Sequence, residues 1–423
     1  MGANGVRPQA SSEDPAAFRE SVIRFVRSLN TGVPGEYRMS PGGHVTLYAS
    51  CFAAMTLHYL DALAVLAEGE SQSWAEYIRK WQDPKTGWFL GPELSEGELR
   101  SRRHDLTHLS MHLTAHVLPT LDLLETTPAH PLTEARKYTD LDHLDQWLAQ
   151  RDWRDAWLEG NNLLFVGQFL LYLRDRERVA AAQNALERLF DWLDREQDPT
   201  TGLWGTNGFC DPFDALYGGY HQLLLYYYCG RTVPRAEAII DTVLKLQHRD
   251  GTFTRRGGGG ACEDVDAVDV LVNLSQRTGY RRRRVRTALN AILQRVLATH
   301  HPEGGFVYRL NQPYQYMGMA RTRTDRNVPH LFATWFRVHT IALITQVLQT
   351  HPLARLDWRF NPSLSMGWYA PVSPSSPERG THLTDYLPFS AQRMLWMLRY
   401  LRPYHARRVF RHLIGRGSAG KAA

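Results

Sequence analysis

The chain has 423 residues, of which 43% are hydrophobic and 22% are charged, so it can bury a large core and is not a disordered protein. It contains no run of about 18 uncharged apolar residues, which argues against a transmembrane helix. The four cysteines, Cys51, Cys210, Cys229 and Cys262, form no CxxC pair, which predicts a reduced, cytoplasmic protein without a zinc finger.

The net charge of +6 comes from the end of the chain. From Arg393 onwards there are eight Lys or Arg and no Asp or Glu, which leaves 41 basic and 43 acidic residues in the remainder. The body is therefore nearly neutral, and no nucleic-acid partner is predicted. Residues 390–415 have helical periodicity with a basic face, which predicts either peripheral contact with an anionic membrane or packing against the body.

A short turn motif recurs along the chain: Gln or His, then Asp or Glu, usually Gly, and then an aromatic residue. Its copies are WQDPKTGWF from Trp81, QRDWRDAW from Gln150, QDPTTGLWG from Gln197, QHRDGTF from Gln247 and HPEGGFVY from His301. Asp-Pro and Gly favour turns, and the aromatic residue can pin each turn against a neighbouring helix. The second copy lacks the Gly.

Each motif lies between two helical patterns of different character. A charged, amphipathic stretch precedes it and a less charged, aromatic-rich stretch follows, which predicts one helix with a face in water and one covered on most sides. Six such pairs are predicted. The amphipathic helices start near residues 13, 73, 134, 177, 233 and 281, and the buried helices start near residues 45, 104, 156, 213, 263 and 329.

Six outer–inner hairpins predict an all-α fold, an (α/α)6 toroid over residues 1–350 with the inner helices around a central cavity. Residues 351–423 are predicted to form a C-terminal loop across one end of the barrel and a basic helical extension. No polar linker divides the chain near its middle, which argues against two separate helical domains. An open α-solenoid of the HEAT or TPR type is the alternative interpretation.

The turn motifs resemble the QW-type repeats of terpenoid cyclases and protein prenyltransferase β-subunits, which share an α/α barrel. The stretch CEDVDAVDVLVNL is similar to the acidic DxDD segment of class II terpenoid cyclases, with Asp264 and Asp266 in the first two carboxylate positions and Ala267 in place of the last. The resemblance implies an isoprenoid substrate that is cyclised after protonation.

Protein prenyltransferases have a zinc-binding Asp-x-Cys near this point and a His on a later inner helix. Here Asp266 stands where that Cys would be, and His330 begins the next inner helix. We therefore predict no cofactor, and the alternative is a divalent metal, Mg or Zn, held by Asp264, Asp266 and His330.

Apart from the resemblance, polar residues follow one face of the fifth inner helix, namely Cys262, Asp266, Asp269 and Asn273. Helix capping explains Glu263 and Asp264 in the first turn, but it explains Asp266 and Asp269 poorly. Closely spaced buried carboxylates repel each other, so one of them should hold its proton near neutral pH. Asp264, Asp266 and Asp269 are therefore the candidate catalytic residues, able to protonate an alkene, an epoxide or a glycosidic oxygen.

The other inner helices carry the residues predicted to bind the substrate, namely His108, Asn161, Asp214, Tyr217, His221, His330 and Arg337. Four histidines at four-residue intervals, His104, His108, His112 and His116, are interpreted as a polar cavity wall, with metal binding as the less favoured alternative. His221 can equally be a core histidine.

These patterns predict an enzyme that uses acid chemistry in a central cavity, and the resemblance implies that it acts on an isoprenoid, as a small-molecule or lipid-linked substrate. The first alternative is a carbohydrate-active toroid, a glycoside hydrolase, lyase or epimerase, with Asp266 or Asp269 as acid and Asp214 as base. Inverting sugar hydrolysis would need Asp214 and Asp266 about 6.5–9.5 Å apart across the cavity. The second alternative is a toroid that binds a partner without catalysis.

Overall fold

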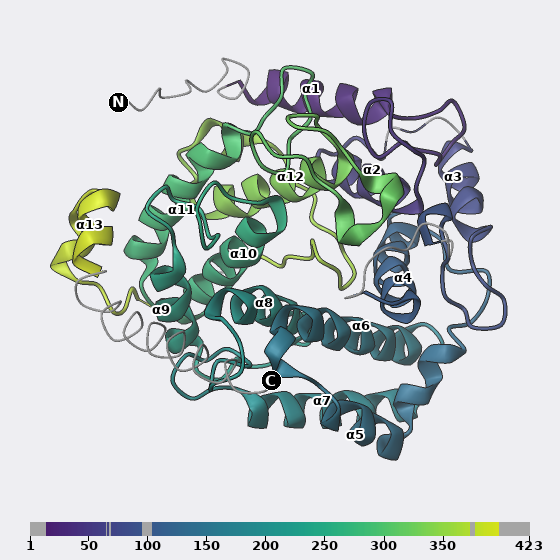
Figure 1. Cartoon of the computed structure of the whole chain (residues 1–423), viewed down its shortest axis with the longest axis horizontal. Coiled ribbons are helices and arrows are strands. Elements are labelled where there is room, and N and C mark those ends of the chain that lie inside the picture. Colours follow the sequence, from purple (N-terminus) through teal and green to yellow (C-terminus); the bar gives the residue numbers. More distant parts are fainter. Residues whose placement is uncertain (1–13, 65, 67–68, 95–103, 373–376, 397–423) are drawn as a thin grey trace, which may run out of the picture.

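A computed structural model describes residues 14–64, 66, 69–94, 104–372 and 377–396, and its helices alternate between two layers (Figure 1). The inner layer consists of α2 (Leu47–Tyr59), α4 (Leu106–Leu123), α6 (Ala156–Asp175), α8 (Pro212–Tyr228), α10 (Ala261–Thr278) and α12 (Leu331–Val347). The outer layer consists of α1 (Pro15–Ser28), α3 (Glu70–Arg79), α5 (Leu141–Ala149), α7 (Ala181–Glu196), α9 (Ala236–Leu246) and α11 (Arg282–Leu297). Every inner helix begins within about two residues of the predicted start.

The inner helices form a closed ring. Each one contacts the next along the chain, and α12 returns to contact α2. The two layers differ in burial as predicted, since α12 is buried on all sides from Leu331 to Thr345, whereas α7 buries a single stripe from Ala182 to Leu193. The prediction of an α/α toroid is therefore confirmed, and an open solenoid is excluded because its end helices would not meet.

The glutamines of the turn motifs tie successive repeats together. Gln197 donates from Nε2 to the backbone oxygens of Gly202, in its own turn, and of Pro234, just before the next outer helix, each at 2.8 Å. Gln82 and Gln247 make the equivalent pairs of hydrogen bonds. The glutamine of the turn motif therefore holds its own turn together and also fixes the distance between one helical hairpin and the next.

The last motif closes the ring onto the first helix. Gly304 has a φ of +102°, and a Cβ at this position would lie 2.0 Å from the backbone oxygen of Ser21 on α1. In this copy His300, one residue before the predicted start of the motif, takes the glutamine position, since its Nε2 lies 3.2 Å from the Gly304 oxygen. The prediction placed the motif one residue too late.

A further copy, which the sequence pattern missed, lies between α1 and α2. Asn30 forms an antiparallel bridge with Tyr37, as Gln82 does with Phe89 and Gln197 with Trp204. The Asn30 Nδ2 donates to the backbone oxygens of Val33 and Glu36, at 2.9 and 3.2 Å. The shorter amide side chain and the absence of a following acidic residue hid this copy in the sequence.

Two segments cross the ends of the barrel. Residues 306–330, between α11 and α12, carry Tyr316 to the first half of α4, where its hydroxyl contacts His112. Residues 351–370, after α12, lie near the opposite ends of the inner helices, where the Gly367 oxygen accepts from Tyr59 and the Leu364 oxygen accepts from Gln168. Each segment thereby covers part of one end of the ring.

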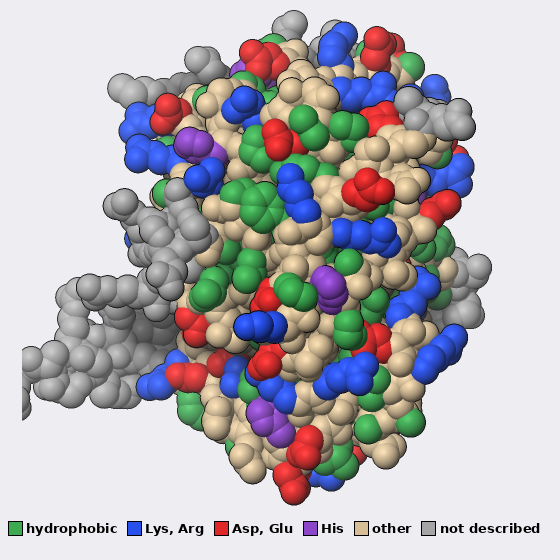
Figure 2. Space-filling view, turned by 90° about the vertical axis from the view of Figure 1, so that its right-hand side faces the viewer, with side chains coloured by type: hydrophobic (Ala, Val, Ile, Leu, Met, Phe, Trp, Pro, Cys, Tyr) green, Lys and Arg blue, Asp and Glu red, His purple; other side chains and the backbone are tan. Residues whose placement is uncertain are grey.

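The surface matches the balanced charge of the body. On the face in Figure 2, Lys and Arg side chains alternate with Asp and Glu side chains and form no block of one sign. No helix in the described part of the chain has the length and apolarity to cross a membrane. The short helix α13 (Phe389–Trp396) contacts α11, and the basic tail after residue 396 lies outside the described residues.

Candidate functional site

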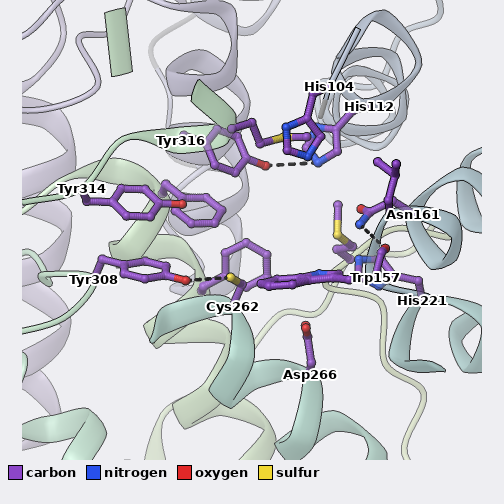
Figure 3. A pocket seen from close by; sticks show the side chains of 15 residues that line it. His104, His112, Trp157, Asn161, His221, Cys262, Asp266, Tyr308, Tyr314 and Tyr316 are labelled. Atoms are coloured by element: carbon purple, nitrogen blue, oxygen red, sulfur yellow. Dashed lines mark hydrogen bonds between the residues drawn. The ribbon is translucent and has the colours of Figure 1, made fainter. Parts of the chain in front are cut away.

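A cavity of about 180 Å³ lies inside the ring, at the end where the inner helices begin (Figure 3). The residues that line it are His104, His112, Trp157, Leu158, Asn161, His221, Cys262, Asp266, Tyr308, Tyr314, Tyr316, Met317, Phe332, Phe336 and Met366. They come from α4, α6, α8, α10 and α12 and from the two crossing segments. Ring closure therefore brings together residues that are more than 250 positions apart.

Asp266 is the one carboxylic acid among the described lining residues. Its side chain extends from α10 toward the cavity (Figure 3), it is 1% exposed, and its Oδ2 has no hydrogen-bond partner among the described residues. Burial, followed by the negative charges of Glu263, Asp269 and Asp264, raises the pKa of the Asp266 carboxyl well above its ordinary value. This shift favours the protonated form of the Asp266 carboxyl, which lies next to the cavity.

Asp264, two residues earlier, is held by the framework of the barrel. Its carboxylate accepts from Arg337 on α12 at 2.7 Å and from the backbone N–H groups of Phe253 and Gly260, at 3.0 and 3.1 Å. Two other inner helices make the same kind of hydrogen bond to the turn motif that precedes them. Thr114 on α4 accepts from the N–H of Phe89, and Thr334 on α12 accepts from the N–H of Phe306. Asp264 thus fixes the turn before α10 and does not line the cavity.

Asp269 lies one turn beyond Asp266, below the cavity. It is fully buried and accepts one hydrogen bond from Asn273, at 3.1 Å. Burial raises the pKa of Asp269 to about 8, against the smaller lowering effects of Asn273 and Arg277. Asp269 shares the helix stripe with Asp266 but does not reach the cavity, where α10 contributes only Cys262 and Asp266.

One side of the cavity is an aromatic wall formed by Tyr308, Tyr314, Phe332 and Phe336. The rings of Tyr308 and Tyr314 stack with their centroids 4.0 Å apart, and Tyr314 is nearly parallel to Phe332. Trp157 adds an indole ring near the acid (Figure 3). The stacked rings give this side of the cavity an apolar lining.

The other side is a polar wall formed by His104, His112, Asn161 and His221 (Figure 3). The His221 Nδ1 lies 2.7 Å from the backbone oxygen of Tyr217, which can only accept, so Nδ1 carries the hydrogen and Nε2 is the acceptor of a neutral ring. Burial lowers the pKa of His221 to about 4, and it lowers the pKa of His112 well below its ordinary value. The polar wall is therefore uncharged at its two deeper histidines.

Three of the predicted site residues line the cavity, Asp266, Asn161 and His221, and the others lie outside it. Asp214 pairs with Arg255 at 2.6 Å, and Arg337 is bound to Asp264. These partners explain why neither charge points inward.

The remaining predicted residues are also engaged in local contacts. His108 bonds to Asn162 at 2.8 Å. Tyr217 donates to the Phe253 oxygen at 2.8 Å and packs against Trp157. His330 caps the N-terminus of α12 and stacks on Tyr314, which places it behind the aromatic wall.

The alternative metal ligands are not gathered around one point. Asp264 faces Arg337, whereas His330 accepts from the backbone N–H of Ala333. Among the described residues, no three His, Cys, Asp or Glu side chains lie close enough together to hold a metal ion. The donor set present at Asp266 thus does not fit the Mg or Zn site of that alternative.

Sequence reasoning missed most of the aromatic wall. Tyr308, Tyr314 and Tyr316 lie in the long segment before α12, and Met366 lies in the segment after it. The one signal in the sequence was the density of tyrosine in YRLNQPYQY, since a solvent-exposed loop of this length rarely carries three such rings.

Comparison with known families agrees with this architecture. The family profile described as "Prenyltransferase alpha-alpha toroid domain" matches residues 17–150 and 165–278, which together exceed half of the chain. No curated protein matches the sequence. With six outer–inner hairpins, turn motifs that join them and a match of this extent, the chain belongs to the prenyltransferase alpha-alpha toroid domain family.

Proposed function

We propose that this protein is a terpenoid cyclase-like enzyme in which Asp266 protonates a carbon–carbon double bond of an isoprenoid. The observation that carries the proposal is a single carboxylic acid, buried without a hydrogen-bond partner among the described residues, beside a cavity with an aromatic wall. Burial raises the pKa of this carboxyl well above its ordinary value, which favours the protonated form that a general acid needs.

The step balances within the cavity. The π electrons of the alkene form a new C–H bond, the O–H bond of Asp266 breaks, and a carbocation and a carboxylate remain. The two opposite charges attract strongly in a medium of low dielectric constant, and the Trp157 indole near the acid adds cation–π stabilisation. Attack by a second double bond closes a ring, and loss of a proton to the carboxylate or to water completes the isomerisation.

The same geometry weighs against the carbohydrate-active alternative. Inverting hydrolysis needs a second carboxylate on the opposite side of the substrate, and the retaining reaction needs two carboxylates about 5–5.5 Å apart. Asp214, the residue predicted for that role, is paired with Arg255 and does not line the cavity. Among the described lining residues, Asp266 has no second acid to act with.

The decisive experiment uses deuterium oxide. The purified protein is incubated in D₂O with geranyl, farnesyl and geranylgeranyl hydrocarbons, alcohols and diphosphates, and the products are analysed by mass spectrometry. We expect a cyclic isomer that carries one deuterium on the carbon that is protonated, because the Asp266 proton exchanges with solvent between turnovers.

Two variants complete the test. Asp266→Asn should abolish the deuterated product, whereas Asp214→Asn, which alters an acid outside the cavity, should form it at the wild-type rate. A product without deuterium, or an Asp266→Asn variant that remains active, would contradict the proposal. Failure of every isoprenoid to react with the wild type would favour the non-catalytic binding toroid.

A further inference from the structure

We infer that the isoprenoid accepted by this cavity has an uncharged hydroxyl head group and not a diphosphate. The inference rests on the proposed function and narrows its substrate class. It is carried by the hydrogen-bonding groups of Asn161, His112 and His221 on the polar wall (Figure 3).

The first argument concerns charge. No Lys or Arg is among the described residues that line the cavity. Two cations near the cavity among the described residues have other partners, since Arg337 binds Asp264 and Arg309 binds Glu263, at 2.7 and 3.2 Å. A diphosphate in this space would lose its hydration without gaining a counter-ion, which is costly.

The second argument concerns the histidines. A protonated imidazole could replace Lys or Arg as a phosphate ligand, but burial lowers the pKa of His221 to about 4. His112 is held between two tyrosines, with its Nδ1 2.8 Å from the Tyr48 hydroxyl and its Nε2 3.2 Å from the Tyr316 hydroxyl. A neutral ring has one donor and one acceptor, and these two tyrosines satisfy both. Neither histidine therefore supplies positive charge.

The third argument is the complementarity of the groups that remain. The His221 Nε2 is an acceptor with no partner among the described residues, in a ring that lines the cavity. Asn161 donates one N–H to the Trp157 backbone oxygen at 3.0 Å, which leaves its amide oxygen and a second N–H. A hydroxyl is both donor and acceptor, so it can donate to His221 and accept from Asn161.

Binding without turnover tests this inference. In Asp266→Asn the amide keeps the shape of the protonated carboxyl but has no acidic proton. Isothermal titration of this variant with farnesol, farnesyl diphosphate and β-farnesene, at one fixed detergent concentration, compares a hydroxyl, a diphosphate and no head group on similar chains. We expect farnesol to bind about tenfold or more tightly than farnesyl diphosphate, because the diphosphate loses hydration without a counter-ion.

A second substitution locates the contact. Adding His221→Phe, which keeps the ring and removes the acceptor, should weaken farnesol binding about three- to tenfold and leave β-farnesene binding unchanged. His44→Phe, at an exposed histidine, is the matched control and should change neither affinity.

The possible outcomes separate the two proposals. Tighter binding of farnesyl diphosphate than of farnesol, or no binding of farnesol, would overturn the head-group inference even if the wild type cyclises an isoprenoid. Equal loss of farnesol and β-farnesene affinity in the His221→Phe variant would also overturn it. Selective farnesol binding with no deuterated product from the wild type would overturn the cyclase proposal alone.

Discussion

Asp264 and Asp266 are two residues apart on α10, and both are almost fully buried, yet their surroundings differ in kind. Asp264 has a guanidinium and two backbone N–H groups as partners, whereas Asp266 has none among the described residues. Burial raises the pKa of both carboxyls, but only Asp264 has Arg337 to oppose that rise. The partners of a buried acid, more than its burial, therefore decide whether it holds the fold or keeps a proton for chemistry.

The same contrast separates two regions of the molecule. In the framework, Gln197 and Thr334 make hydrogen bonds to the backbone of the turn motifs, whereas in the cavity the Asp266 Oδ2 has no partner among the described residues. Unsatisfied polar groups cost stability and are retained where function needs them. The following predictions test this division between framework and cavity.

The largest effect is expected on turnover at Asp266. Loss of a general acid typically slows a reaction about 100- to 10,000-fold, so Asp266→Asn should lower the rate by at least that factor. Its melting temperature should stay the same or rise, because the substitution removes a buried carboxyl whose ionised form is disfavoured by burial and by the negative charges of its neighbours. A clear fall in melting temperature in a thermal melt would place Asp266 in the framework.

The opposite pattern is expected at Asp264. Asp264→Asn leaves the fully buried Arg337 without its counter-ion, and breaking a buried ion pair in this way costs about 3–5 kcal/mol of unfolding free energy. Urea denaturation measures this loss. Adding Arg337→Met should recover part of it, and a double variant no more stable than Asp264→Asn would contradict the ion-pair assignment.

A smaller effect is expected where the ring closes. Gly304 and Gly32 have similar φ values, +102° and +97°, but a Cβ at Gly304 would meet the Ser21 oxygen, whereas a Cβ at Gly32 would meet nothing within 4 Å. Both substitutions strain the backbone to a similar extent, so the difference between them reports the contact of the new Cβ with the Ser21 oxygen. Gly304→Ala should therefore destabilise the protein by about 1–3 kcal/mol more than Gly32→Ala does. Equal losses in chemical denaturation would show that this contact is not tight.

The last effect is a pH dependence at Asp269. An unfolded Asp has a pKa of about 3.9, whereas burial raises that of Asp269 to about 8 in the folded protein. Between these values the unfolded chain releases the proton and the folded chain retains it, so rising pH favours unfolding until about pH 8. The melting temperature of Asp269→Asn, relative to wild type, should therefore rise from pH 4 to pH 8.

Asp325→Asn, at an exposed residue, serves as the control and should show no such trend. A constant difference between Asp269→Asn and wild type across this pH range would mean that Asp269 is ionised in the folded protein.

The helices could be predicted closely because their signals are local. The amphipathic stripe of α7 and the apolar run of α12 are read directly from consecutive residues, and the motif at Gln197 marks the turn between two of them. The copy of the turn motif at Asn30 was not predicted, because it has the backbone geometry of the other copies but has Asn in place of Gln or His and no acidic residue directly after it. Backbone geometry tolerates substitutions that a sequence pattern does not.

The site was less predictable because its members depend on partners that are remote in sequence. The stripe on α10 correctly grouped Asp266 with Asp269, but helical spacing could not show that Asp269 stops below the cavity. Nothing near Asp264 in sequence reveals Arg337, and nothing near Asp214 reveals Arg255. The aromatic wall depends on where a 25-residue segment, 306–330, lies across the end of the barrel.

The amino-acid sequence by itself determined the alternation of outer and inner helices, the starts of the inner helices and the turns that join them, because hydrophobic periodicity and turn chemistry act over a few residues. The third outer helix, predicted to start near residue 134, begins at Leu141 after a short 3₁₀ turn. Only the tertiary structure decided which polar residues share a cavity. Closure of the ring between α12 and α2 places residues from five inner helices around one space, and it gives Asp264 a partner while leaving Asp266 without one. Whether a buried charge is neutralised depends on distances across the barrel, and spacing along the chain does not encode those distances.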